Sequence, residues 1–184
     1  MPVVEAHLIE GYADEAKARL AATLSAAVTQ VVPAPPEAIT VLIHEVSASG
    51  YSRGGPKTPA PALPDPVGVI RGYLDAMEAR DLDAARAHLG EGFAMRFPGA
   101  PPMTTLAELI AWAAPRYRFV RKAYEGFDVA ASEGQVVVFA RGTLSGEWPD
   151  GTPFEGVRFI DRFALEGGKI VAQDVWNDLA EVRP

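Results

Sequence analysis

The 184-residue chain contains no cysteine, which excludes disulfide bonds, thiolate catalysis and cysteine-ligated metal sites. It also has few histidines: only His7, His44 and His88, widely separated along the sequence. This spacing argues against a histidine-rich metal centre, and no motif indicates a bound cofactor. We therefore expect neither a metal nor a cofactor.

The sequence also lacks long apolar runs and an excess of basic residues. Its apolar stretches fall short of the ~18 residues that a membrane-spanning helix needs. The beginning of the chain carries acidic side chains, whereas a signal peptide has a basic start and an apolar core. A formal net charge of −7 opposes contact with nucleic-acid phosphates. We expect a cytoplasmic protein that binds a small molecule rather than a membrane or a nucleic acid.

One short stretch departs from this acidic average. Four cations fall close together, at Arg116, Arg118, Arg121 and Lys122. Such a run either forms a solvated face or meets an anionic ligand, and the sequence leaves both interpretations open.

Proline, by contrast, is abundant, and it is concentrated in one place. Five of the 16 prolines fall within residues 56–66. Proline fixes φ and removes a backbone donor, so neither a helix nor a central strand runs through such a segment. We expect a first domain over residues 1–56, a semi-rigid linker over residues 57–66 and a second domain over residues 67–184.

The first segment has the pattern of a strand, a helix and a second strand. Residues 3–9 alternate between apolar and polar, residues 14–32 have helical spacing, and residues 39–46 form the second strand. A helical crossover of this length makes the two strands parallel. So small a unit buries little apolar surface, and oligomerisation is the usual remedy. We therefore expect a homo-oligomer.

The chain begins Met1-Pro2, directly before the first strand. Removal of Met1 would free the secondary amine of Pro2. An α-amino group has an ordinary pKa of about 7.7–8.0, and burial lowers that value. Such an amine acts as a general base near neutral pH and takes a proton from the carbon beside a carbonyl.

Residues 2–56 resemble the 4-oxalocrotonate tautomerase family. The resemblance is carried by PVVEAHLIEG at residues 2–11, the helix with its early charges, the second strand and the GYSRGG tail at residues 50–55. It implies a β-α-β unit that assembles as an oligomer, with Pro2 as general base and Tyr51 in the wall of the active site. Tyr12 and Thr40 stand where the best-known members have two arginines, so a dicarboxylate substrate is not expected. The residues leave open whether Pro2 is catalytic or idle.

The second segment reads as helices followed by strands. We expect helices over residues 67–80 and 82–89, and a third that begins with the capping pair Thr105 and Glu108. Four strand-like stretches follow, over residues 119–129, 135–148, 157–165 and 169–176. This order predicts an α+β fold in which a curved antiparallel sheet wraps helices around a pocket.

Residues 67–182 resemble the SnoaL-like and ketosteroid-isomerase-like cone domains of the nuclear-transport-factor-2-like fold. The resemblance is carried by IRGYLDA at residues 70–76, RDLD at residues 80–83, FIDRF at residues 159–163 and GKIV at residues 168–171. It implies that Tyr73 and Asp161 match a known oxyanion-binding pair, a tyrosine and a protonated aspartic acid. Phe97 stands at the position of the catalytic base, so isomerisation of a steroid by that mechanism is not expected.

Alternation along residues 157–165 also places Asp161 on one strand face with apolar neighbours, where a carboxyl needs a partner. We predict that Tyr73, Asp161, Phe97, Trp112 and Tyr117 bind a ligand in the cone. The alternative is a structural carboxyl among ordinary core aromatics.

Together these patterns predict an isomerase that interconverts keto and enol forms of a small carbonyl compound, with Pro2 as general base. The cone domain would bind a partly apolar ligand. Two alternatives remain: a non-catalytic binding or assembly module, and a cyclase or hydratase that acts in the cone pocket.

Overall fold

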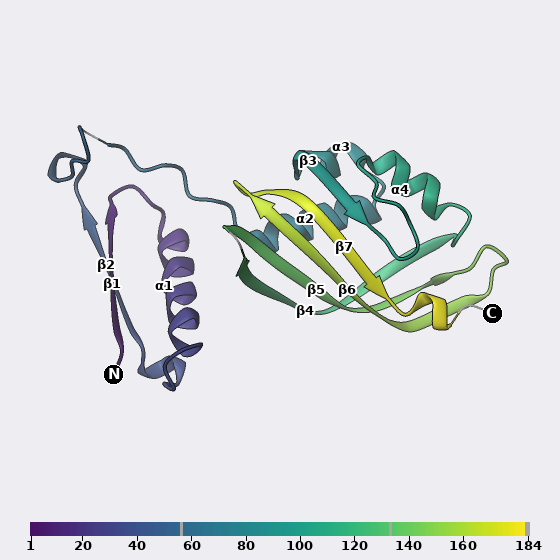
Figure 1. The fold of residues 1–184 in the computed structure, drawn as a ribbon, viewed down its shortest axis with the longest axis horizontal. Helices are drawn as coiled ribbons and strands as arrows, with labels where there is room; N and C mark the ends of the chain where they lie inside the picture. Colours follow the sequence, from purple (N-terminus) through teal and green to yellow (C-terminus); the bar gives the residue numbers. More distant parts are fainter. Residues whose placement is uncertain (56, 133, 183–184) are drawn as a thin grey trace. The chain divides into compact units, whose positions relative to one another are not determined.

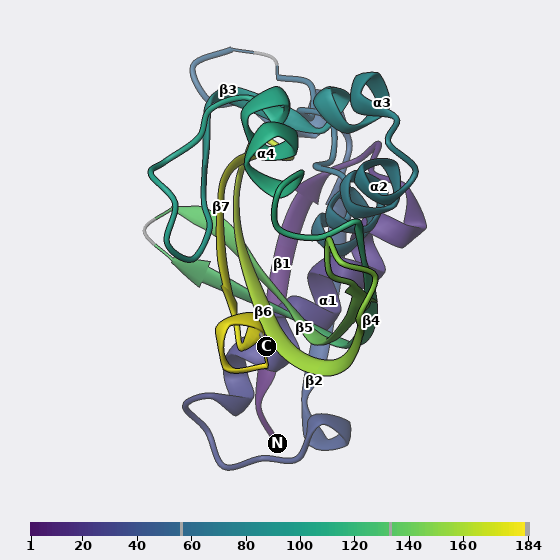
Figure 2. The same ribbon diagram turned by 90° about the vertical axis from the view of Figure 1, so that its right-hand side faces the viewer.

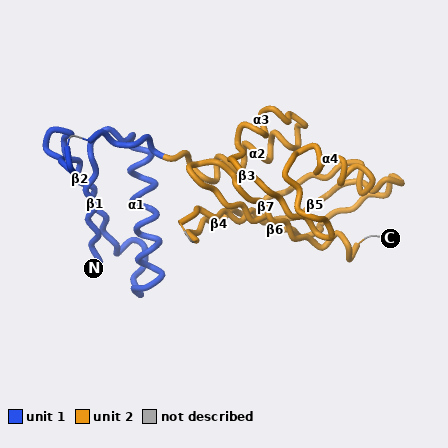
Figure 3. The backbone as a smooth tube through the Cα atoms, turned by 45° about the horizontal axis from the view of Figure 1, so that its top comes forward, with its two compact units in different colours: residues 1–62 blue, residues 63–184 orange. Residues whose placement is uncertain are grey.

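The computed structural model describes residues 1–55, 57–132 and 134–182. The chain divides into two compact units, residues 1–62 and residues 63–184 (Figure 3). Pro56 of the proline-rich segment and Arg183 and Pro184 of the predicted second domain lie outside the described residues. Within the described part of the chain, no helix is long and apolar enough to cross a membrane.

The first unit is the predicted β-α-β unit. Strand β1 (Val3–Ile9) leads into helix α1 (Asp14–Thr29), and strand β2 (Thr40–Val46) returns beside β1. The strands are parallel, with Val3 opposite Thr40 and Ile9 opposite Val46. Short 3-10 helices, Pro36–Ala38 and Ala48–Gly50, flank β2. Helix α1 lies along one face of this two-stranded sheet (Figure 1).

This first unit has no interior of its own. Among its described residues none is buried. On the sheet face away from α1, Val3 and Leu42 are 54% and 41% exposed. A sheet face of this kind gains stability only when another surface covers it.

The second unit is an α+β fold with one curved sheet. Its helices are α2 (Pro66–Glu78), α3 (Leu82–Ala87) and α4 (Leu106–Ala113), and a short 3-10 helix, Leu179–Glu181, follows the last strand. Its strands are β3 (Leu89–Arg96), β4 (Phe119–Ser132), β5 (Gln135–Glu147), β6 (Pro153–Glu166) and β7 (Lys169–Asn177), in the order β3-β7-β6-β5-β4. The three helices lie on one side of the sheet (Figures 1 and 2).

Strand β3 is the element that the sequence patterns missed. It pairs in parallel with β7, whereas the other neighbouring strands are antiparallel. The predicted second helix accordingly ends at Ala87 rather than at residue 89. Gly90 and Gly92 interrupt the alternation at the start of β3, which leaves only Phe93 and Met95 as a visible buried pair.

Helix starts in this unit follow their capping residues. Asp65 accepts a hydrogen bond from the Gly68 N–H at 2.8 Å, and Pro66 occupies the first turn, where its missing donor costs nothing. The predicted capping box at α4 is confirmed, because Thr105 and Glu108 exchange side-chain and backbone hydrogen bonds. These contacts fix the helices that cover the sheet.

Irregular pairing curves the sheet. The β4–β5 register shifts between Tyr124 and Gly126, and the β5–β6 register shifts between Leu144 and Gly146. Bulges of this kind bend a strand and increase its twist. The backbone at Gly142 approaches β4 so closely that a Cβ there would lie 2.0 Å from the Ala123 carbonyl oxygen. The bent sheet leaves two apolar clusters, one under α2 and α4 and one near the β5–β6 hairpin.

Candidate active and ligand-binding sites

Pro2 is placed at one end of the two-stranded sheet. It directly precedes β1, and its carbonyl oxygen accepts a hydrogen bond from the Thr40 N–H at 3.0 Å. Pro2 is half-buried, whereas Met1 is 92% exposed. The start of β2 therefore holds the predicted catalytic proline.

Tyr51 lies at the opposite end of the same sheet. It follows β2, which runs parallel to β1, so a strand of seven residues separates it from the Pro2 end. At about 3.3 Å per residue, this is roughly 20 Å. Tyr51 lines a cavity of about 240 Å³ together with His7 and Tyr12. One copy of the chain thus does not bring Pro2 and Tyr51 together, and a site that contains both needs a second copy.

Two histidines that are distant in sequence are neighbours in this sheet. His7 lies opposite His44, and their rings stack with centroids 4.8 Å apart. His7, His44 and Glu5 each offer an atom that could coordinate a metal ion. These atoms lie within 4.8 Å of one another, on exposed side chains. Distance along the sequence therefore did not predict distance in space, because the parallel register pairs the two positions. The expectation that the protein holds no metal stays a prediction.

The second unit contains a cavity of about 430 Å³, which we call the outer chamber. This volume lies in the range of small-molecule sites. Its walls come from α2, from α4, from β4 and the segment before it, and from β7. The residues used below are Tyr73, Arg80, Phe97, Tyr117, Lys122, Tyr124 and Gln173.

A smaller cavity of about 60 Å³, the inner chamber, adjoins the outer chamber. The two chambers share four lining residues: Phe97, Tyr117, Val120 and Lys122. Asp161 and Trp112 line only the inner chamber. All five residues predicted to bind a ligand therefore lie around one or both chambers.

A polar network connects the two chambers. The Tyr73 hydroxyl donates to Gln173 Oε1 at 3.1 Å, and Gln173 Nε2 donates to Asp161 Oδ2 at 3.5 Å. The Lys122 ammonium pairs with the same Oδ2 and lies 4.7 Å from the centre of the Phe159 ring. Asp161 is fully buried.

This network differs from the arrangement that the resemblance implied. Asp161 is an acceptor in both of its contacts, and Tyr73 reaches it through Gln173. The structure therefore does not show two hydroxyls directed at one carbonyl. Gln173 and the role of Lys122 were missed, although a glutamine in the apolar alternation of β7 is a visible sequence signal.

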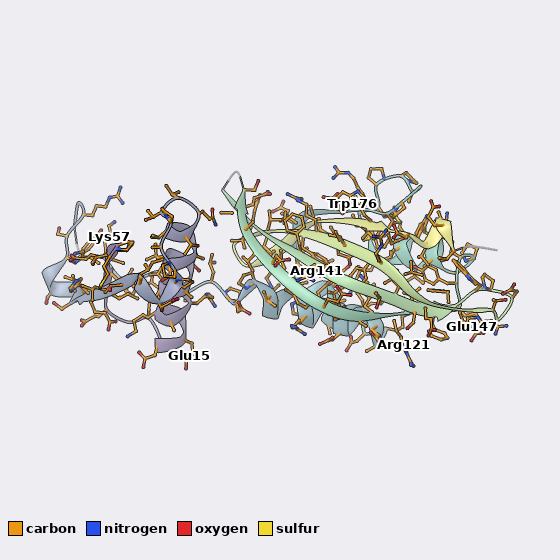
Figure 4. All side chains as sticks on the ribbon, turned by 90° about the horizontal axis from the view of Figure 1, so that it is seen from below. Glu15, Lys57, Arg121, Arg141, Glu147 and Trp176 are labelled. Atoms are coloured by element: carbon orange, nitrogen blue, oxygen red, sulfur yellow. The ribbon has the colours of Figure 1, made fainter. Side chains whose placement is uncertain are left out.

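The other cations of the run at residues 116–122 have partners of their own or face solvent, although Arg118 and Arg121 also line the outer chamber. Arg116 stacks on the Trp112 ring at 4.1 Å, and Arg118 pairs with Glu147. Arg121 is exposed and extends outward from β4 (Figure 4). Lys122 is turned inward, because alternation along β4 places it on the covered face.

The tyrosines around the outer chamber are hydroxyl donors rather than bases. Burial raises the pKa of Tyr73 well above its ordinary value, and the negative charge of Asp161 raises it further. Burial and Asp161 act in the same way on the pKa of Tyr124. Burial also raises the pKa of Tyr117, against the opposing charges of Arg80 and Arg116. At neutral pH all three keep their protons.

Both units match families of known proteins. The family model described as a SnoaL-like domain matches residues 70–173, more than half of the chain. The model described as a tautomerase enzyme matches residues 2–57. A "Probable tautomerase" of Bacillus cereus is 42% identical over 55 residues, which are 30% of this chain and 90% of that protein. The chain belongs to both families.

Further relatives agree with this assignment. A "Probable tautomerase" of Ralstonia nicotianae is 40% identical over 65 residues, 35% of this chain and 93% of that protein. An NTF2-like protein of unknown function from Burkholderia pseudomallei has a TM-score of 0.56 at 19% identity, over 65% of this chain and 95% of that one. The last comparison shows the fold alone. We refer below to residues 1–62 as the tautomerase domain and to residues 63–184 as the SnoaL-like domain.

Two polar atoms at the inner chamber of the SnoaL-like domain have no partner. Among the described residues, Asp161 Oδ1 and Trp112 Nε1 are buried without a hydrogen bond. Buried polar atoms are almost always paired, so each such exception calls for an explanation. Phe97, whose ring lies 5.3 Å from that of Trp112, brings no ionisable group to this site.

Proposed function

We propose that this protein is a keto–enol tautomerase in which Pro2 is the general base on a small carbonyl compound. One observation carries the proposal: Pro2 directly precedes β1 in a unit that matches the tautomerase family from residue 2. Membership of the tautomerase family already indicates an isomerase-type domain. The role of Pro2 is the step that needs a test.

The proposed reaction moves one proton between carbon and the amine of Pro2. With Met1 removed, the unprotonated amine takes a proton from the carbon beside the carbonyl and leaves an enolate, whose oxygen is then protonated to give the enol. In the reverse direction the enol hydroxyl loses its proton, and the protonated amine of Pro2 gives a proton to the carbon and yields the ketone. Because Tyr12 and Thr40 replace two arginines of the best-known members, the substrate is expected to carry at most one carboxylate.

The test is the enol-to-keto turnover of 2-hydroxy-3-phenylpropenoate, followed by ultraviolet absorbance. Pro2→Ala should lower turnover by orders of magnitude, because it replaces a positioned secondary amine with a primary one. Val31→Ala, which keeps the proline and changes a position 85% exposed beyond the end of α1, is the control and should retain turnover. Unchanged turnover in Pro2→Ala, or intact-mass spectra in which Met1 is always retained, would contradict the proposal.

We further propose that the active site is shared between copies of a homo-oligomer, with Tyr51 of one copy near Pro2 of another. The opposite placement of these residues within one sheet supports this. Pro2→Ala and Tyr51→Ala proteins should each lose turnover, and co-refolding the two should restore part of it. No restoration after subunit exchange, verified by mass, would argue against a shared site.

In the SnoaL-like domain, we propose that the outer chamber holds a partly apolar carbonyl compound. Its binding site would be lined by Tyr73, Phe97, Trp112, Tyr117 and Asp161.

A second candidate function, a cyclase or hydratase reaction in this cavity, is favoured by the free oxygen of the Asp161 carboxylate. Turnover that survives Pro2→Ala and disappears in Asp161→Asn would favour this candidate. A purely binding role remains if neither variant changes any turnover.

A further inference from the structure

Two residues that line the inner chamber each carry one buried polar atom without a hydrogen-bond partner, an acceptor on Asp161 and a donor on Trp112. Asp161 Oδ2 already receives Lys122 and Gln173, so Oδ1 is the remaining acceptor of this carboxylate. Trp112 Nε1 can only donate. Asn177 also lines this chamber, and its side-chain oxygen already accepts a hydrogen bond from the Leu179 N–H at 3.2 Å.

The remaining surface of the inner chamber is mostly apolar. It includes Val120, Leu144, Phe159 and Val175. At about 60 Å³ it is too small for a whole ligand, but it has room for the polar end of one. A buried donor or acceptor without a partner costs about 1–3 kcal/mol. A group that satisfies both atoms therefore binds much more tightly than one that satisfies neither.

Only some chemical groups can satisfy both atoms. A carbonyl oxygen accepts from Trp112 and leaves Asp161 Oδ1 unpaired. An ammonium group donates to Asp161, leaves Trp112 unpaired and lies close to the Lys122 charge. A hydroxyl donates and accepts through one oxygen atom.

We propose that the inner chamber is a subsite for a hydroxyl on an unsaturated carbon, a phenol or an enol, whose carbon frame occupies the outer chamber. The hydroxyl donates to Asp161 Oδ1 and accepts from Trp112 Nε1. The aromatic walls formed by Phe97, Trp112 and Phe159 favour a flat group over a saturated ring. This inference rests on the ligand site proposed for the SnoaL-like domain and names the group that the site selects.

The test is titration calorimetry of the full-length protein with ketones of one frame. 4-(4-Hydroxyphenyl)butan-2-one should bind about tenfold to hundredfold more tightly than 4-phenylbutan-2-one. The 4-methoxyphenyl analogue accepts but does not donate, and it should bind no more tightly than the phenyl compound. The 4-hydroxycyclohexyl analogue should show a smaller gain than the phenol.

Matched variants identify the atoms involved. Trp112→Phe keeps an aromatic ring and removes the N–H, and it should reduce the hydroxyl gain to less than about threefold. Trp176→Phe is the control, because Trp176 is 54% exposed on β7 and lines neither chamber (Figure 4). It should keep the full gain. Circular dichroism melts verify that both variants are folded.

The outcomes separate this inference from the proposed function. If no ketone binds, the ligand site itself is wrong. If the hydroxyl and phenyl compounds bind equally, as they would when a tightly held water satisfies both atoms, the hydroxyl subsite is wrong and the ligand site stands. An equal gain for phenol and cyclohexanol would overturn the preference for an unsaturated carbon, and a gain that persists in Trp112→Phe would overturn the role of its N–H.

Discussion

The SnoaL-like domain completely buries Ile70, Met95 and Phe163, whereas no described residue of the tautomerase domain is buried. The SnoaL-like domain also encloses its cavity within one chain. The tautomerase domain separates its two predicted catalytic residues by the length of a strand. We therefore expect one domain to carry a complete site and the other to carry parts of a site that assembly completes.

The largest expected effect tests whether the tautomerase domain depends on assembly. Light scattering at micromolar concentration should give a multiple of the chain mass, 19.6 kDa. Leu42→Glu should lower the mass to that of one chain, because it places a charge on the uncovered sheet face. Turnover that depends on Pro2 should be lost together with the assembly.

Val31→Glu is the control for this experiment. Val31 is 85% exposed and lies beyond the end of α1, away from the sheet face. Its variant should keep the mass of the wild type. A wild-type mass of 19.6 kDa would refute the homo-oligomer.

The next prediction compares the stability effect of one lysine–carboxylate pair in each domain. In the SnoaL-like domain, Lys122→Met leaves the buried Asp161 without its ion pair, which should cost about 3–5 kcal/mol in the free energy of unfolding. In the tautomerase domain, Lys17 pairs with Asp14 and Glu45 near solvent, so Lys17→Met should change stability little. Urea unfolding measures both.

The double variant Lys122→Met/Asp161→Leu completes the comparison. It removes both buried charges, so most of the lost stability should return. If the Lys122→Met and wild-type proteins are equally stable, the ion pair does not contribute to the free energy of unfolding.

Asp161 shows what a sequence pattern can and cannot predict about a side chain: its direction is predictable, and its partner is not. Alternation along β6 placed it on the covered face, because side-chain direction in a strand has a strict period of two. Its partner Lys122 lies on β4, which is separated from β6 by β5. The two meet because the sheet is curved, and curvature depends on register shifts that no local pattern encodes.

The same limit applies to His7 and His44. They are 37 positions apart in the sequence, yet the parallel register places them opposite each other. The sequence predicted both strands and their parallel direction, but a one-residue slip in register would have separated the rings. Elements and directions were predictable here, whereas contacts across the sheet were not.

A third effect tests the curvature directly. Gly142→Ala would place a methyl group 2.0 Å from the Ala123 carbonyl oxygen, so β4 and β5 must separate. We expect a loss of about 3 kcal/mol in the free energy of unfolding. The matched change in the tautomerase domain, Gly50→Ala, meets only side chains, Ser47 at 3.2 Å and Val46 at 3.5 Å, and should cost no more than about 0.5 kcal/mol. Similar losses in the two variants would argue against close packing as the cause of the curvature.

The smallest effect concerns a strained residue at the mouth of the cavity. Arg80 has a φ of 61°, the only positive φ among the described residues other than glycine. It follows α2 in a Schellman motif, because the Arg80 N–H donates to the Met77 carbonyl and the Asp81 N–H donates to the Ala76 carbonyl. Glycine is the usual residue at this position, and an arginine there costs about 1–2 kcal/mol.

The position of its side chain suggests why the strain is kept, since Arg80 lines the outer chamber and its charge acts on Tyr117. Arg80→Gly should therefore raise the free energy of unfolding by about 1 kcal/mol and weaken the binding of 4-phenylbutan-2-one. Arg80→Ala removes the same guanidinium without relieving the backbone, so it should weaken binding and add no stability. If both variants bind the ketone as well as the wild type, Arg80 has no part in the site. If Arg80→Gly gains no stability over Arg80→Ala, the left-handed backbone at this position is not strained.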